Sequence, residues 1–473
     1  MTTLVESFAD FTTELRFEQL PSRVAEESKR LLIDAIGCAL GGLSHPKGTI
    51  GVEYARLMGA GAPGSQATIL GTGGRVSTVA AAFANAELIN ALDFDAILPP
   101  GHVSPYVIPG ALAVGEAGRV SGREMLCAVA LSHEMSHRIG KSMDYLRDIK
   151  DGKVSPPPVF GYASTVFGAA AAIGRLKGYS PETVAHALGI AGSISPVNSH
   201  WCWSQHAPGT TVKYTAAGPL AQTAMAAAHM AEFGHRGDLR ILDDGEFGYR
   251  RFIGSSRWTP ERMLPGLGAE WLFPAEQSYK PYPHCRILHA LLDCLTGIVE
   301  ANDIRPAEID GINAWVEAFV MQPIWLQRKI EHVTDGQFSV AHGLSVGAHR
   351  IPPGKQWQSP EVVFDPSVLA LMDRISFEVH PEYEKLVSGN AASRPARIEV
   401  LARGQSFVGE ARYPKGSPSP DAASTMTTDE LVTKFVRNAE GVVAAERIDQ
   451  ALLQLLNLEQ VEDFSGVMCL LAQ

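Results

Sequence analysis

The 473-residue sequence lacks any uninterrupted apolar run as long as the roughly 18 residues that indicate a membrane-spanning helix. Its first residues, MTTLVESFADF, carry acidic side chains and no basic segment followed by an apolar one. We therefore expect neither membrane insertion nor secretion, and a cytoplasmic location.

Cysteine is scarce and scattered. The chain has six cysteines and no CxxC pair, which argues against a disulfide framework and against a zinc ribbon. We expect reduced, structural thiols at Cys38, Cys127, Cys202, Cys285, Cys294 and Cys469.

Basic residues are outnumbered as well. The sequence has 40 Lys and Arg against 51 Asp and Glu, a formal net charge of -11, which disfavours a nucleic-acid partner. A local basic pocket for a small anion stays open. The 45% apolar and 19% charged residues are ordinary for a globular protein, and the length supplies core for two or three domains.

From Phe8 to about Pro265 the apolar spacing is helical nearly throughout, with Gly and Pro at the breaks. After about Trp271 alternating stretches at 312–320, 375–380 and 396–402 predict strands next to helices. The tail from Thr427 returns to an amphipathic helical pattern. The predicted fold class is a large all-helical domain plus a smaller α+β domain, with the C-terminal helices returning to the helical domain. The expected boundaries are 1–268 for the first part of the helical domain, 269–410 for the α+β domain and 411–473 for the return.

The most informative segment is 76–109, where an alanine-rich helix capped by Ser77 runs into Asp93, Asp95 and then His102. The helix dipole is negative at this end, so a carboxylate is disfavoured by up to about 1 kcal/mol unless cations or donors compensate. We interpret the segment as a candidate site. The alternative is a pair of solvated or capping aspartates beside a histidine in a turn.

Two other segments supply cations. In GTTVKYTAAGP, Lys213 precedes a helix start, with Ser204, His206 and Thr210 upstream, which predicts an anion-binding corner. The alternative is a surface lysine. In SYKPYPHCRILHALLD, four basic side chains lie at the expected domain junction, where clefts form: Lys280, His284, Arg286 and His289. Arg286 could bind a carboxylate bidentately, and Lys280 is a second candidate acid or base.

One motif suggests a different chemistry. His133, Glu134 and His137 fit the H-E-x-x-H pattern of zinc peptidases. No third ligand follows at the usual distance, so we prefer buried helix histidines beside Arg138 and expect no metal.

Taken together, these segments resemble the MmgE/PrpD family, which includes 2-methylcitrate dehydratase, cis-aconitate decarboxylase and iminodisuccinate epimerase. The resemblance covers most of the chain and rests on seven segments in order. These are AAAFANAELINALDFDA with His102, EMSHRIG, STVFGAAAAIGRLKG, GTTVKYTAAGPLAQ, KPYPHCRILHALLD, QFSVAHGLSVG, and YPKGSP leading to LVTKF.

The resemblance implies a cofactor-free enzyme, usually a homodimer, whose site lies between a helical and an α+β domain. It carries the family's site residues onto Asp93, His102, Lys213 and Lys280. Two positions depart from the lyase pattern, because Ile97 stands where a threonine is common and Tyr162 stands where a second histidine is common.

We therefore predict an enzyme that abstracts a proton next to a carboxylate of a small di- or tricarboxylic acid, most simply a dehydratase or decarboxylase. His102 is the expected general acid or base, oriented by Asp93; Lys213 and Lys280 stabilise the anion, and Tyr162 is the opposing acid. The expected substrate-binding residues are Arg286, His284, Asp95 and His206. An epimerase and a non-catalytic helical scaffold are the alternatives.

Overall fold

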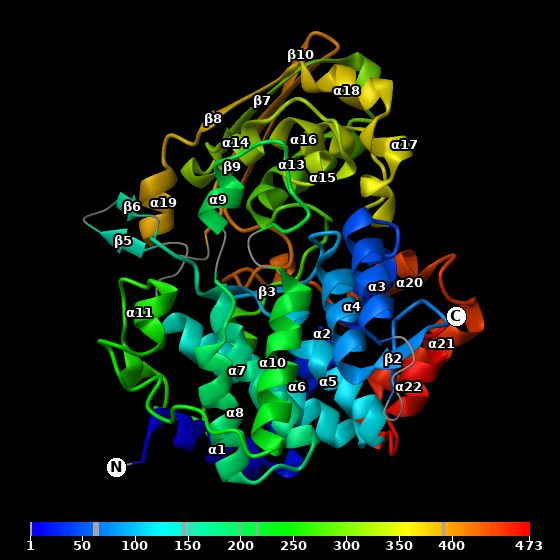
Figure 1. The fold of residues 1–473 in the computed structure, drawn as a ribbon. Coiled ribbons are helices and arrows are strands. Elements are labelled where there is room, and N and C mark those ends of the chain that lie inside the picture. Colours follow the sequence, from blue (N-terminus) through cyan, green and yellow to red (C-terminus); the bar gives the residue numbers. More distant parts are fainter. Residues whose placement is uncertain are drawn as a thin grey trace.

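The computed structural model describes residues 2–59, 66–143, 148–150, 153–155, 157–197, 200–213, 216–389 and 393–473, with the backbone alone at 148–150, 153–155, 252, 388 and 389. Figure 1 shows two parts stacked on each other. A helical part occupies the lower half, and a sheet covered by helices occupies the upper half. The predicted fold class, mostly helical with a smaller α+β part, is confirmed.

Helix α4 (Thr78–Asn90) lies at the centre of the helical part, in contact with α2, α3, α5 and α10. The Ser77 side chain accepts a hydrogen bond from the Ala80 amide, the predicted N-cap. The α4 alanines are buried and let these helices approach closely. The surrounding helices are α1 (Leu4–Glu14), α2 (Ser22–Gly42), α3 (Pro46–Gly59), α5 (Ser104–Gly118), α6 (Gly122–Lys141), α7 (Thr165–Leu176), α8 (Pro181–Ser193) and α10 (Ala217–Glu232).

Glycine permits the closest of these approaches. A Cβ added to Gly42 at the end of α2 would lie 2.2 Å from the carbonyl oxygen of Leu88 in α4, so any larger residue would push the two helices apart. Short strand pairs and short helices fill the connections: β1 (Gln66–Thr68), β2 (Arg75–Ser77), β3 (Ile97–Leu98), β4 (Gly101–His102), β5 (Asp148–Lys150), β6 (Lys153–Ser155), α9 (His200–Ser204), α11 (Tyr249–Ile253) and α12 (Phe273–Glu276).

The upper part is built on a four-stranded sheet in the order β10-β9-β7-β8. Strand β7 (Ile309–Val316) pairs antiparallel with β9 (Ala396–Ala402) and parallel with β8 (Ile375–Val379). The alternating sequence predicted these three strands. It did not predict β10 (Gln405–Ala411), an edge strand whose residues are all exposed or half-buried. The helices of this part are α13 (His289–Ala301), α14 (Pro323–Leu326), α15 (Val333–Gly336), α16 (Val340–Ala348), α17 (Pro360–Val363), α18 (Pro366–Met372) and α19 (Tyr383–Gly389).

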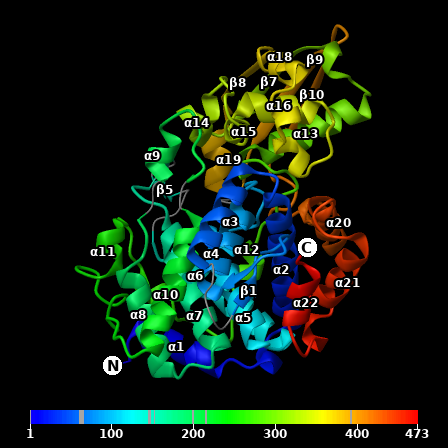
Figure 2. The ribbon, with the colours of Figure 1, turned by 45° about the vertical axis from the view of Figure 1, so that its right-hand side comes forward.

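The C-terminal helices α20 (Thr428–Ala439), α21 (Ala445–Leu456) and α22 (Ser465–Leu470) return to the helical part. Figure 2 shows them in red beside α2, and α20 and α21 both contact that helix. Their apolar faces bury Leu431, Phe435 and Leu455, as the amphipathic pattern predicted. Within the described ranges, none of the helices combines the length and the apolar character that crossing a bilayer requires.

Candidate active site

Helix α4 ends beneath the upper part of the molecule, and the carbonyl groups of its last residue and of the turn that follows accept hydrogen bonds from side chains of distant segments. A helix normally satisfies these groups with its own following backbone or with water. Four of these bonds are Lys213 Nζ to Asn90 O (2.6 Å), Gln337 Nε2 to Ala91 O (2.8 Å), Gln358 Nε2 to Leu92 O (2.7 Å) and Lys280 Nζ to Asp93 O (2.7 Å). A fifth, longer one joins Lys213 Nζ to Ala91 O (3.4 Å). The position of this turn therefore depends on residues from both parts of the molecule.

Asp93 is the centre of the cluster. Its backbone is left-handed, with φ of 51°, a conformation that aspartate tolerates better than most residues. Its carboxylate lies 2.6 Å from Lys280 Nζ, 3.7 Å from Lys213 Nζ and 3.6 Å from His102 Nε2. Burial opposes the charge, but Lys280, Lys213 and His102 together hold the pKa of Asp93 well below its usual value. The carboxylate is therefore ionised, and these groups supply the compensation that a charge at the end of a helix needs.

Lys213 also has a left-handed backbone, with φ of 55°, and its side chain is buried. Burial lowers its pKa to about 8, with Asp93 acting in the opposite direction. The sequence predicted that Lys213 would form an anion-binding corner at the start of α10. That corner is occupied by Glu87, whose Oε1 accepts the Gly218 amide at 2.7 Å, and Lys213 points to the end of α4 instead.

His102 forms its shorter carboxylate contact with Asp95. Its Nδ1 lies 2.6 Å from Asp95 Oδ2, and the other oxygen of Asp95 accepts the Asn90 side-chain amide at 3.3 Å. The sequence interpretation gave the orienting role to Asp93 and a substrate contact to Asp95. The geometry instead favours Asp95 as the residue that orients His102. Asp95 accepts the Nδ1 hydrogen and leaves Nε2 as the nitrogen that exchanges a proton.

The hairpin β3–β4 carries His102 and links the two halves of the site. Ile97 pairs with His102 inside the hairpin and also forms two backbone hydrogen bonds with Ser278, of 2.7 and 2.9 Å. Ser278 lies two residues before Lys280. The pairing of Ile97 with both His102 and Ser278 therefore fixes the positions of His102 and Lys280 relative to each other. Figure 1 shows β3 at the level where the helical part meets the α+β part.

Tyr162 closes one side of the cluster. Its ring lies 6.3 Å from that of His102, between centroids, and packs on Gly101, where an added Cβ would be 1.8 Å from Cε1. Burial raises its pKa, so the phenol stays protonated near neutral pH. The ring of His200 stacks on the other side of Tyr162, with 6.0 Å between ring centroids. Burial lowers the pKa of His200 to about 3. The sequence patterns did not point to His200.

The other predicted substrate contacts have different partners. Arg286 donates to Lys415 O and to the Ser417 hydroxyl and contacts His289. His284 accepts the Cys285 amide at 2.9 Å, and burial lowers its pKa to about 3, so it is neutral. His206 is exposed, 3.7 Å from Cys202 Sγ.

The H-E-x-x-H residues have structural roles. Glu134 accepts hydrogen bonds from Arg138 Nε and from the amides of Leu272 and Phe273. His133 Nδ1 contacts Val129 O in its own helix, whereas His137 Nδ1 contacts Pro99 O in the β3–β4 turn. Among the described residues, no three His, Cys, Asp or Glu side chains are arranged to hold a metal ion.

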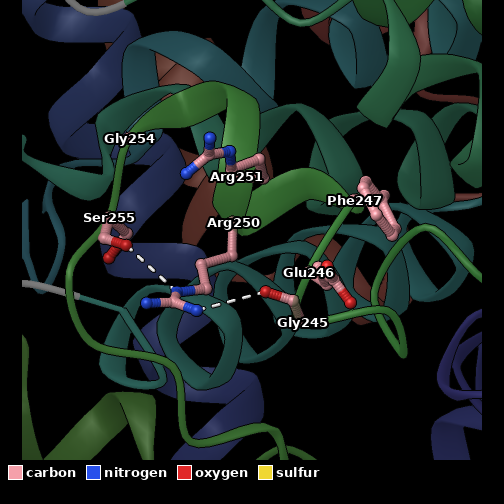
Figure 3. A pocket seen from close by; sticks show the side chains of 7 residues that line it. All are labelled: Gly245, Glu246, Phe247, Arg250, Arg251, Gly254 and Ser255. Carbon is pink, nitrogen blue, oxygen red and sulfur yellow. Dashed lines mark hydrogen bonds between the residues drawn. The ribbon is translucent and has the colours of Figure 1, made fainter.

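Figure 3 shows a separate pocket on the surface around α11. Its central guanidinium, Arg250, donates to the backbone carbonyls of Ser255, Gly245 and Ser256. A guanidinium is not an acid–base group, and its donors here are taken up by backbone carbonyls. It is lined by Gly245, Glu246, Phe247, Arg250, Arg251, Gly254 and Ser255.

Comparison with known proteins shows the family of the chain. The MmgE/PrpD N-terminal domain model matches residues 6–261, and the MmgE/PrpD C-terminal domain model matches residues 282–458. A cis-aconitate decarboxylase-like protein of Aspergillus oryzae is 25% identical, over 98% of this chain and 96% of its own. The human cis-aconitate decarboxylase is 23% identical, over 99% and 94%. That of Aspergillus terreus is 24% identical, over 98% and 94%.

Proposed function

The chain belongs to the MmgE/PrpD family and is an enzyme of the lyase type, and from this premise we propose that it decarboxylates a small unsaturated tricarboxylic acid of the cis-aconitate kind. The relatives that match it over nearly their whole length carry that activity in their names. We further propose that the reaction takes place at the Asp93 cluster and uses only the chain's own residues. A homodimer and a cytoplasmic location belong to the same proposal.

The observation that carries the proposal is the convergence of two buried ammonium groups and an imidazole on Asp93. Lys213 and Lys280 are both fully buried, and each has a carboxylate of the same residue within 4 Å. Buried cations strongly stabilise a negative charge that develops beside them. A reaction that passes through a carbanion next to a carboxylate needs this environment.

The proposed reaction proceeds by loss of carbon dioxide followed by protonation of carbon. The carbon–carbon bond to one carboxylate breaks, carbon dioxide leaves, and the electron pair remains on carbon, delocalised into the neighbouring unsaturated acid. Lys213 and Lys280 stabilise this anion. His102, in its imidazolium form with Nδ1–H held by Asp95, delivers the Nε2 proton to carbon and becomes neutral, and the product is an unsaturated dicarboxylate. Tyr162, whose phenol is neutral, faces the same region as a second proton donor.

Incubation with cis-aconitate in heavy water tests the proposal. We expect carbon dioxide release and an unsaturated dicarboxylate that carries one deuterium on the protonated carbon. Deuterium exchange with loss of configuration in a dicarboxylate such as iminodisuccinate, and no new alkene, would identify an epimerase instead and overturn the proposal.

A non-catalytic scaffold makes a different prediction, which a thermal-shift screen with cis-aconitate and related acids checks. A ligand present at 100 times its Kd stabilises the folded state by about 2.7 kcal/mol. We expect such a shift with the substrate, and the scaffold alternative predicts none with any of the acids.

The turnover rate is expected to fall as the pH rises through about 8, the pKa of Lys213. The ammonium form stabilises the anion, whereas burial disfavours that form in the folded state. The unfolded chain therefore binds more protons between pH 8 and the ordinary value of 10.5, and the stability contribution of Lys213 rises with pH there while the rate falls.

A pH profile of kcat, together with denaturant unfolding at the same pH values, checks that the rate falls while the stability rises. Lys213→Arg keeps its charge at higher pH, so the fall in kcat should move to higher pH. A wild-type rate that stays constant through this range would show that the Lys213 charge is not used.

A further inference from the structure

A third buried lysine, Lys434, reaches the site from the C-terminal helix α20. Its Nζ donates to Phe94 O at 2.6 Å and to Lys280 O at 3.1 Å. These are backbone groups of the segments that carry Asp93 and Lys280. A residue from the far end of the chain therefore joins the two segments whose side chains form the central ion pair.

The charge of Lys434 is balanced by Asp34 of α2. Nζ lies 2.7 Å from Asp34 Oδ1, while the other oxygen of Asp34 accepts the Ala96 amide at 2.9 Å. The ammonium group also sits 3.8 Å from the centre of the Phe94 ring. Burial opposes the ammonium form, but Asp34 raises the pKa of Lys434, so it stays charged. The Asp34–Lys434 pair thus contacts residues 94–96 at three places: the Phe94 carbonyl, the Phe94 ring and the Ala96 amide.

Building on the function proposed above, we propose that Lys434 is a positioning residue of the active site, which fixes the distance between Asp93 and Lys280 through their backbones. It does not touch the substrate. The Asp34–Lys434 pair binds both segments at once. The loss of Lys434 leaves the Ile97–Ser278 pairing and the Lys280 side chain to set the distance between the 93–96 turn and the segment at Lys280. Displacements of about 1 Å in a catalytic cluster can lower a rate about a hundredfold.

The test compares Lys434→Met, Lys434→Arg and the double variant Asp34→Asn/Lys434→Met. Lys434→Met alone leaves the Asp34 carboxylate buried without its cation, which destabilises a fold strongly. The double variant removes both charges at nearly constant volume and keeps an acceptor for the Ala96 amide, so we expect it to fold.

In the folded double variant we expect kcat to fall at least about tenfold while KM changes less than about threefold, because positioning acts on the reacting groups more than on binding. Lys434→Arg should recover part of the rate, since it keeps the charge and the donors. A purely structural role predicts instead that kcat returns to the wild-type value once the double variant is stable.

Lys355→Met is the matched control. Lys355 also holds α20, through the carbonyls of Asn438 and Glu440 at the C-terminal end of the helix, but it does not contact Phe94 O or Lys280 O, the carbonyls that Lys434 binds. We expect wild-type kcat from this variant. Wild-type kcat in the folded double variant overturns the role of Lys434, provided that Lys280→Met lowers the rate. If Lys280→Met is also fully active, the proposed active site itself is wrong.

Discussion

Lys280→Met is expected to lower kcat for the proposed decarboxylation at least about a hundredfold, the low end of what a positioned acid–base or electrostatic group contributes. Lys280 is the closest cation to Asp93, at 2.6 Å, and it also donates to the Asp93 carbonyl. Its loss removes one of the two ammonium groups that stabilise the anion, and it frees the turn that carries Asp93. Steady-state kinetics on the folded variant measure the effect.

The same substitution also leaves the Asp93 carboxylate without its nearest counter-charge, and breaking a buried ion pair costs about 3–5 kcal/mol of stability. Asp93→Asn/Lys280→Met should therefore recover stability in denaturant unfolding and stay inactive. Lys29→Met is the control, because Lys29 is another buried lysine, paired with Glu26 and Glu459 away from the cluster. A Lys280→Met enzyme within fivefold of the wild-type rate would remove Lys280 from the mechanism.

His102→Ala is the second substitution with a large expected effect, again at least about a hundredfold in kcat, because it deletes the group placed to deliver the proton. His102 lies between two carboxylates, with Asp95 at 2.6 Å and Asp93 at 3.6 Å. Rates measured with cis-aconitate on folded protein check this. His349→Ala, which removes a histidine bonded to Ser345 and Ser367 in the upper part, is expected to keep the wild-type rate.

Asp95→Asn tests the orienting role of Asp95 at nearly constant side-chain volume. An asparagine amide that donates to Nδ1 would leave the hydrogen of neutral His102 on Nε2, so Nε2 could not take up a proton from solvent between turnovers. We expect kcat to fall while substrate binding changes little. If His102→Ala and Asp95→Asn both turn over at near-normal rates, the proton comes from another group.

Part of this site could be predicted from residues that lie close together in the sequence. The alanine-rich helix, its Ser77 cap and the carboxylates at its negative end are local features, and the requirement for nearby cations followed from the helix dipole. The sequence assigned Lys213 and Lys280 to stabilising a substrate anion and did not pair them with Asp93, whose carboxylate both of them contact.

The rest depends on tertiary contacts that no local pattern encodes. Gln337, Gln358 and Lys434 reach the turn after α4 from segments more than 240 residues away in the chain. Gln337 and Lys434 lie in segments that carry the family resemblance, but the resemblance implied no role for either residue. Which of two carboxylates faces His102 is set by the β3–β4 hairpin, and nothing in the spacing of Asp93 and Asp95 distinguishes them.

Arg286 was predicted from its residue type to bind a substrate carboxylate, but its surroundings in the structure give it other partners. A buried guanidinium needs several acceptors, and Lys415 O, Ser417 and His289 supply partners within the protein. The sequence could not show these partners, because the first two lie about 130 positions further along the chain.

The most direct test of the central claim, that the ammonium groups around Asp93 carry the reaction, uses the variant Asp93→Asn/Lys213→Met/Lys280→Met. Its folding is checked by circular dichroism, and labelled carbon dioxide is measured from cis-aconitate that carries carbon-13 in its carboxylates. We predict release from the wild-type enzyme and none above the uncatalysed background from the folded variant. Release from that variant at the wild-type rate would contradict the account.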